Sequence, residues 1–258
     1  ALSARAYAAA ALSILERLAG TSGVGRHPLM QTRSGKTCLI VVTSDKGLAG
    51  ALNSGVIRGA EEVLRTRNLK KEDISVIAFG RRGGDYFASR GYTVEVSHTN
   101  IADGVAEADI STITATILQR TDIGTVIVAY QNFISTFEQQ PTVRQIVPIT
   151  PEIIAEMVAG IRPAKGKYAP SSGKAAEGKP QVYTVEPDEG EVLNVLLPKL
   201  LNIAVFHALL ESKASEHSAR MVAMKSATDK ARDMAKGLTR TFNKVRQAAI
   251  TREVSEIT

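Results

Sequence analysis

The last sixty residues, Lys199 to Thr258, are the feature that most constrains how this chain can fold. Mostly small or apolar residues recur here at alternating steps of four and three positions, which is the spacing of a helix that packs along one face. A helix of this length would extend for about 90 Å, roughly three times the diameter of a small domain. The sequence therefore predicts a rod that projects from its own globular domain. The positions that share the spacing, called the seam below, are Leu210, Ala214, His217, Met221, Met224, Thr228, Ala231, Ala235, Leu238, Phe242, Val245 and Ala249.

The composition of the rod predicts what can surround it. Four seam positions are alanine, and such small side chains let a partner helix approach closely. Beyond Ala249 the spacing falls on Arg252 and Glu256, so the seam becomes polar and we expect no continuous partner helix there. From Arg220 onward, nine Lys or Arg residues stand against four Asp or Glu residues, in a chain of formal net charge +6. A positive rod suits an acidic protein surface, nucleic acid or an anionic membrane.

Residues 1–20 are predicted to form an N-terminal helix that ends at Gly20. Alanine and leucine repeat the four-three spacing in this segment, so we expect the first and last helices to pair as an antiparallel coiled coil. A helix of this size spans only about 28 Å and would cover part of the rod. Two compatible interpretations stay open: further residues precede Ala1, or other chains surround the rod.

Between the terminal helices, apolar runs alternate with amphipathic stretches, which favours an α/β fold with a mostly parallel, doubly wound sheet. The predicted domains are residues 1–20, 21–188 and 189–258, with a mobile Pro-, Gly- and Lys-rich loop at 163–180. Pro198 is expected to mark a kink or a new helix start. The predicted strands are residues 37–43, 74–79, 92–96, 125–130 and an edge strand at 139–149, and the predicted helices are residues 51–67, about 81–90 and 107–120.

Motifs for catalysis and cofactor binding are weak. Residues 34–37, Ser-Gly-Lys-Thr, resemble the end of a phosphate-binding loop, but they precede their strand and Met30 stands where glycine is required. Residues 47–50, Gly-Leu-Ala-Gly, follow a predicted strand and open a helix, but they lack the G-x-G-x-x-G spacing of a dinucleotide-binding turn. The four histidines are expected at the surface or in the seam, without acidic or cysteine neighbours at ligand spacing. Cys38, the one cysteine, is expected to be a buried, inert thiol.

These features predict no catalytic, cofactor-binding or metal-binding residues. No stretch is judged to approach the roughly 20 apolar residues of a membrane span. Two other functions stay open: a nucleic-acid or membrane-surface binder, whose affinity would fall steeply with salt, and a dinucleotide enzyme on the α/β half.

Three stretches carry a family resemblance. Residues 44–53 read Ser-Asp-Lys-Gly-Leu-Ala-Gly-Ala-Leu-Asn, residues 214–224 read Ala-Ser-Glu-His-Ser-Ala-Arg-Met-Val-Ala-Met, and residues 242–251 read Phe-Asn-Lys-Val-Arg-Gln-Ala-Ala-Ile-Thr. The first resembles the S-D-[KR]-G-L-C-G-x-x-N turn of the γ subunit of rotary F-type ATP synthases. The other two resemble the C-terminal helix of that subunit nearly residue for residue.

The resemblance implies a central rotor stalk of a proton-driven ATP synthase, with no catalytic site or cofactor of its own. A Rossmann-like domain would stand at the foot of a coiled coil formed by the two terminal helices. One copy per complex would couple rotation of the c-ring to sequential changes at three catalytic sites, inside a hexamer of α and β subunits. An ε-type subunit would join its foot. Neither nucleic acid nor membrane insertion is expected.

The resemblance also implies individual contacts. Arg246 and Gln247 match the pair that meets a polar catch loop of a β subunit, and Arg81 and Arg82 match a loop that faces the acidic lever of a β subunit. These four residues are expected to contact the β subunits.

Glu186 and Asp188 resemble the foot segment near the c-ring or the ε-type subunit. The longer, basic start of the family's N-terminal helix is absent from this sequence, and so is the two-cysteine regulatory insert of the chloroplast type. The expected location is the cytoplasmic face of a bacterial plasma membrane, as part of a peripheral complex, with the matrix face of the mitochondrial inner membrane as the alternative.

Overall fold

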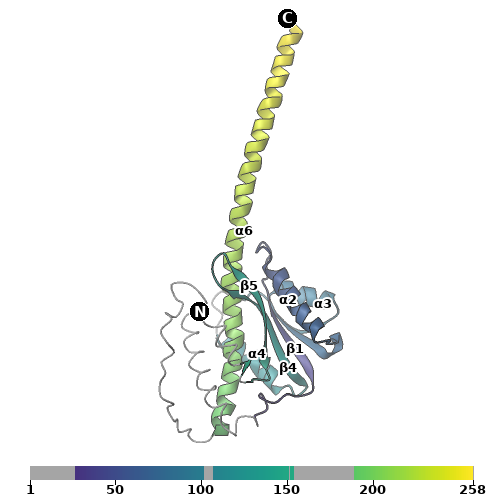
Figure 1. Cartoon of the computed structure of the whole chain (residues 1–258), viewed down its shortest axis with the longest axis vertical. Helices are drawn as coiled ribbons and strands as arrows, with labels where there is room; N and C mark the ends of the chain where they lie inside the picture. The colour runs from purple at the N-terminus through teal and green to yellow at the C-terminus, as the bar shows by residue number, and fades with distance from the viewer. Residues whose placement is uncertain (1–26, 102–106, 151, 154–188, 258) are drawn as a thin grey trace, which may run out of the picture.

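The computed structural model describes residues 27–101, 107–150, 152–153 and 189–257 of the 258-residue chain. An α/β domain packs against the first part of a long helix, which then continues far beyond the domain to the C-terminus (Figure 1). In chain order the elements are β1 (Lys36–Val42), α2 (Leu52–Thr66), a 3-10 turn η2 (Lys71–Asp73), β2 (Ile74–Phe79), α3 (Arg81–Ser89), β3 (Thr93–His98), α4 (Glu107–Gln119), β4 (Ile123–Phe133), β5 (Gln139–Val147) and α6 (Glu189–Ile257).

The five strands form one sheet in the order β3-β2-β1-β4-β5. The pairs β1–β2, β1–β4 and β2–β3 are parallel, and β5 pairs with β4 in the antiparallel sense as an edge strand. The predicted mostly parallel sheet is therefore confirmed, and so is an edge strand that begins at residue 139.

Helices cover both faces of the sheet, which explains why the sequence of β1 is a continuous apolar run. Leu39 and Val41 point to the face covered by α2 and α3, where they pack with Val56 and Phe87. The alternating residues Cys38, Ile40 and Val42 point to the opposite face. There the apolar partners from α4 and α6 are Ile110, Ile117, Leu201, Val205, Ala208 and Leu209.

Helix α6 runs without a break through Pro198, so the predicted new helix start at this residue is wrong, and a kink there stays a prediction. A proline inside a helix removes one backbone hydrogen bond and clashes with the preceding turn. Here the residues on both sides are held by packing, because Leu197 and Leu200 are 0% and 2% exposed. Burial of these leucines against the domain offsets the local cost of the proline.

An 18-residue window of α6 has a mean hydropathy of 1.7, so by length and composition this helix could cross a membrane. The prediction that no stretch approaches such apolar length is therefore wrong. Half of the window is buried inside the molecule, as expected for a helix in the core of a folded domain.

The part of α6 from His217 to Ile257, called the rod below, projects from the domain as the sequence predicts (Figure 1). Its seam side chains face solvent: Met221, Leu238, Phe242 and Val245 are 55%, 69%, 64% and 62% exposed. The N-terminal helix at residues 1–20 and the loop at 163–180 lie outside the described residues, so their pairing and mobility stay predictions.

The end of the rod is more apolar than the seam alone suggests. Arg252 and Glu256 stand on the seam and pair with each other at 2.8 Å, as expected of a polar seam. However, Ile250, Val254 and Ile257, which lie one or two positions after seam residues, repeat the four-three spacing and are all more than half exposed. The apolar line therefore shifts around the helix near its end instead of stopping.

Candidate interaction surfaces

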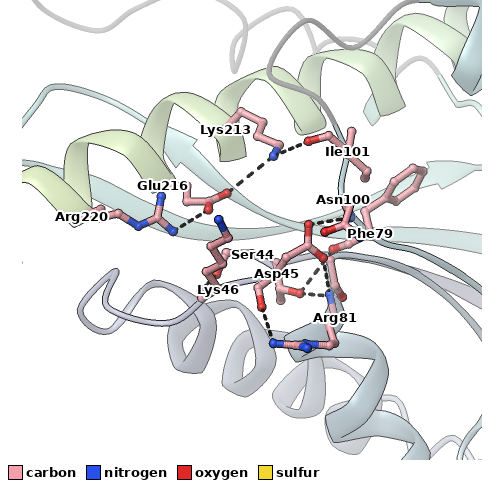
Figure 2. A network of polar contacts seen from close by, with 12 residues as sticks. Ser44, Asp45, Lys46, Phe79, Arg81, Asn100, Ile101, Lys213, Glu216 and Arg220 are labelled. Atoms are coloured by element: carbon pink, nitrogen blue, oxygen red, sulfur yellow. Dashed lines mark hydrogen bonds and ion pairs between the residues drawn. The ribbon is translucent and has the colours of Figure 1, made fainter.

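The turn that follows β1 is held by the side chain of Asp45. Its Oδ1 accepts a hydrogen bond from the backbone N–H of Arg81 at 2.9 Å, and its Oδ2 accepts one from the N–H of Asn100 at 2.8 Å (Figure 2). The backbone N–H of Ser44 donates to Oδ1 of Asn53 at 2.9 Å. One carboxylate thus ties together the segments that follow β1, β2 and β3. The turn is a structural junction rather than a cradle for a cofactor.

The start of α3 approaches this junction closely because of a glycine. Gly80 has φ +91°, and a Cβ built on it would lie 2.1 Å from the carbonyl oxygen of Thr43, so no larger residue fits without a shift. The N–H of Gly83 then donates to Oγ1 of Thr43 at 2.8 Å. These contacts fix the first turn of α3 against the end of β1.

Arg81 and Arg82 lie on that first turn and are both exposed. Cations at the N-terminus of a helix oppose the helix dipole, which favours acidic residues there. The dipole of α3 therefore does not favour this pair, although the guanidinium of Arg81 donates a hydrogen bond to the carbonyl of Asp45 at 3.4 Å. The exposed positive charge of the pair makes it a candidate contact for an acidic partner.

Arg246 and Gln247 lie on the rod and are exposed. They are separated from the base of the rod at His217 by about 44 Å of helix. The structure therefore does not bring the two candidate pairs together, and they would meet different regions of a partner. Glu186 and Asp188 lie outside the described residues.

A row of charges marks the point where the rod leaves the domain (Figure 2). The Nζ of Lys213 donates to the carbonyl of Ile101 at 2.9 Å and lies 3.9 Å from Oε2 of Glu216. The carboxylate of Glu216 also pairs with Arg220 at 2.7 Å. These contacts join α6 to the loop after β3.

Cys38 and His207 are buried in the core, whereas His98 is half-buried at the end of β3. Burial raises the pKa of Cys38 to about 12, and its side chain is fully buried, so the predicted burial of this thiol is confirmed. Burial lowers the pKa of His98, whose ring stacks on Phe79 with centroids 5.2 Å apart. His207 is also buried, and its Nε2 lies 3.4 Å from Oε1 of Glu211.

The expectation that the histidines lie at the surface or in the seam without acidic neighbours is thus wrong for His207. Its acidic neighbour follows four positions later, on the same face of the helix. Among residues 27–101, 107–150 and 189–257, no group of three or more His, Cys, Asp or Glu residues could hold a metal ion.

The carboxyl ends of the parallel strands are where open α/β sheets bind their ligands. Here α6 crosses that place, and a cavity of only about 10 Å³ remains between residues such as Thr43, Gly80, Lys213 and Glu216. A larger hollow of about 640 Å³ opens on the far side of α2, where arginines alternate with Glu61 and Glu62.

Comparison with known proteins gives concordant matches. The sequence profile of the ATP synthase family matches residues 1–258. The ATP synthase gamma chain of Heliobacterium modesticaldum is 35% identical over 260 residues, covering 99% of this chain and 84% of that protein. The gamma chain of Brevibacillus brevis is 38% identical over 259 residues, covering 98% and 83%.

Two solved structures share the fold. The central stalk and c-ring structure of the Tetrahymena thermophila mitochondrial ATP synthase contains a chain with a TM-score of 0.55 and 21% identity, covering 88% of this chain and 98% of that one. The rotor of the Euglena gracilis mitochondrial ATP synthase gives a TM-score of 0.59 at 15% identity, with 96% and 92% covered. With a family match along its whole length and gamma chains among its relatives, this chain belongs to the family of ATP synthase gamma chains.

Proposed function

We propose that this chain is the central rotor stalk of a proton-driven ATP synthase, a non-catalytic subunit that carries rotation from the c-ring to the three catalytic sites of an αβ hexamer. The observation that carries the proposal is α6, a single helix of 69 residues. Its first part is packed in the α/β domain and its last part stands free of that domain. An unbroken helix with one anchored end is suited to transmit torque.

The exposed seam supports an enclosing partner. Large apolar side chains that are more than half exposed along one helix indicate a surface that is covered in the working assembly. We infer that residues 1–20 pair with α6 as an antiparallel coiled coil, and that the hexamer of α and β subunits surrounds the rest of the rod. The chain would then consist of the units 1–20, 21–188 and 189–258, with 163–180 as a mobile loop.

Arg81 and Arg82 are proposed to meet the acidic lever of a β subunit. Both are exposed, both oppose the dipole of α3, and both directly follow Gly80, which lines the same small cavity as Glu216 of α6. Complementary charge at such a surface would steer the partners and fix their orientation as the rotor turns.

Arg246 and Gln247 are proposed to meet the polar catch loop of a β subunit further along the rod. Glu186 and Asp188 are assigned to contact with the c-ring or the ε-type subunit on the family resemblance alone. One copy per complex would sit at the cytoplasmic face of a bacterial plasma membrane, in keeping with the bacterial relatives, and the matrix face of the mitochondrial inner membrane is the alternative. No membrane insertion and no nucleic acid are part of the proposal.

The test is reconstitution with purified α and β subunits of the same source. We expect one copy of the chain to co-elute with each hexamer on gel filtration and to raise the rate of ATP hydrolysis. A folded chain that neither co-elutes nor stimulates would contradict the rotor function. Binding to DNA that weakens steeply with salt would then favour the nucleic-acid alternative.

A further inference from the structure

One edge of β4 lacks a strand neighbour at its end. The pairing of β1 with β4 stops at Val41 and Ala129, whereas β4 continues to Phe133 and pairs there only with β5. The backbone groups of Gln131 and Phe133 that face away from β5 therefore have no strand to bond. Such groups, when buried, must find other partners or cost free energy.

Three side chains of α6 take the place of the missing strand. The Oγ of Ser212 accepts a hydrogen bond from the N–H of Gln131 at 3.0 Å, and Oε2 of Glu211 accepts one from the N–H of Phe133 at 3.1 Å. The hydroxyl of Ser215 donates to the carbonyl of Gln131 at 3.4 Å. Glu211, Ser212 and Ser215 are 2%, 5% and 0% exposed. The helix is thus hydrogen-bonded to the strand within the molecular interior.

These bonds differ in kind from the rest of the contact between α6 and the sheet. Before Glu211 the contact is made by apolar side chains such as Leu201, Val205 and Leu209. Apolar burial is not directional, and the close packing of these side chains holds the helix against the sheet. Hydrogen bonds weaken steeply when their angles change. The three polar residues are therefore directional contacts that help to fix the angle of α6 relative to β4, beside the hydrogen bonds that join Asn202 to Thr114 and Lys213 to Ile101.

The angle between α6 and β4 matters because of where Glu211, Ser212 and Ser215 lie on the helix. They occupy the last buried turn before the rod, which begins at His217 and extends for about 60 Å. A tilt of about 5° at this turn would move the far end of such a helix by roughly 5 Å, enough to lose van der Waals contact along one side. A rotation about the axis would turn the seam away from its partner.

Given the rotor function proposed above, on which this assignment depends, we propose that Glu211, Ser212 and Ser215 form a latch that fixes α6 to β4. Torque between the α/β domain and the rod passes through this latch. The three are positioning residues, because they set the orientation of the rod and contact none of the catalytic groups.

The first experiment measures amide hydrogen exchange in the full chain. Ser212→Ala should speed exchange at the N–H of Gln131, and Glu211→Ala should speed it at Phe133, each roughly fivefold, the size expected of one hydrogen bond. Glu211→Gln keeps an acceptor oxygen and should leave Phe133 protected. The amide of Leu39 in the centre of β1 serves as an internal reference. Equal acceleration at Leu39 would mean a loss of overall stability and would overturn the latch.

The second experiment measures proton pumping per ATP hydrolysed in the assembled complex. We expect the double variant Glu211→Ala and Ser212→Ala to assemble and hydrolyse ATP while pumping at least about twofold fewer protons per ATP. The controls are Glu62→Ala and Ser89→Ala, exposed residues of the same types on α2 and α3. The single variant Glu211→Gln keeps an acceptor oxygen, so it should pump as many protons per ATP as the wild-type chain.

Unchanged pumping in a variant with faster local exchange would overturn the torque role, because the side chains would then serve only to satisfy the strand edge. A wild-type chain that fails to assemble or stimulate hydrolysis would instead overturn the rotor function, and the torque role with it. The exchange experiment separates the two, because it needs no partner subunit.

Discussion

Asp45 illustrates how a single side chain can hold a junction that the sequence presents as a loop. Its two oxygens bind backbone N–H groups that lie 36 and 55 positions further along the chain. The family resemblance singled out the segment of residues 44–53, which contains Asp45. The spacing of residues along the sequence could not identify the two distant backbone donors. They are brought together only by the parallel order of β1, β2 and β3.

Cys38 makes the stability of the domain sensitive to high pH. Its pKa is about 12 in the folded chain against 9.0 for the free group, so its stabilising effect is complete below pH 9.0 and is lost as the pH rises toward 12. At about pH 10.5 the loss should reach about 2 kcal/mol relative to neutral pH. Urea unfolding of the wild-type chain and of Cys38→Ala at both pH values measures it.

The variant supplies the control, because burial also raises the pKa of Tyr130 and so adds a slope of the same sign to both proteins. Only the difference between the two chains reports the thiol. Identical pH dependence in both would show that Cys38 ionises as freely in the folded chain as in the unfolded one.

Among the elements, α6 departs most from local expectation because a proline lies inside it. Pro198→Ala restores a backbone hydrogen bond and a residue of high helix propensity, so we expect the free energy of unfolding to rise by about 1 to 3 kcal/mol. Chemical unfolding followed by circular dichroism would measure the change. Lys199→Ala, at the exposed neighbouring position, tests the gain from an added alanine alone. Equal effects of the two changes would argue against strain at Pro198.

The strands show what could be read from the sequence. Strand β2 has the predicted bounds, because its apolar residues are buried on both faces and polar residues flank them. Strand β4 was predicted to end at Tyr130 but continues to Phe133. Gln131 and Asn132 resemble loop residues, yet pairing with β5 and the hydrogen bonds from α6 hold them as a strand. Tertiary contacts determine where β4 ends, and the local sequence pattern does not indicate these contacts.

The latch residues were hidden for a related reason. Glu211, Ser212 and Ser215 lie within a few positions of one another on α6, and polar residues with this spacing are typical of a solvated helix face. A signal did exist: Ala208 and Leu209 precede them on the buried side, so the polar residues continue an apolar face. Burial of a polar group on such a face requires a partner, but only the structure identifies it as the edge of β4.

At the scale of the whole molecule, two exposed pairs are separated by much of the rod. Arg246→Ala combined with Gln247→Ala should lower coupled turnover in an assembled complex while leaving the α/β domain folded, because both side chains are exposed and far from the sheet. The measurement is ATP synthesis in reconstituted vesicles, with circular dichroism of the isolated chain. Arg240→Ala removes another exposed cation of the rod and serves as control. Undiminished turnover would remove the assignment to the catch loop.

The exposed apolar line of the rod has a consequence for the life of the subunit before it is assembled. In the described part of the chain, side chains such as Phe242, Val254 and Ile257 are more than half exposed, and a continuous apolar surface of this kind promotes aggregation and chaperone binding. A copy without a place in a complex is therefore expected to be short-lived in the cell. The number of stalks would then be matched to the number of hexamers by removal of orphan chains, without any need to balance their synthesis.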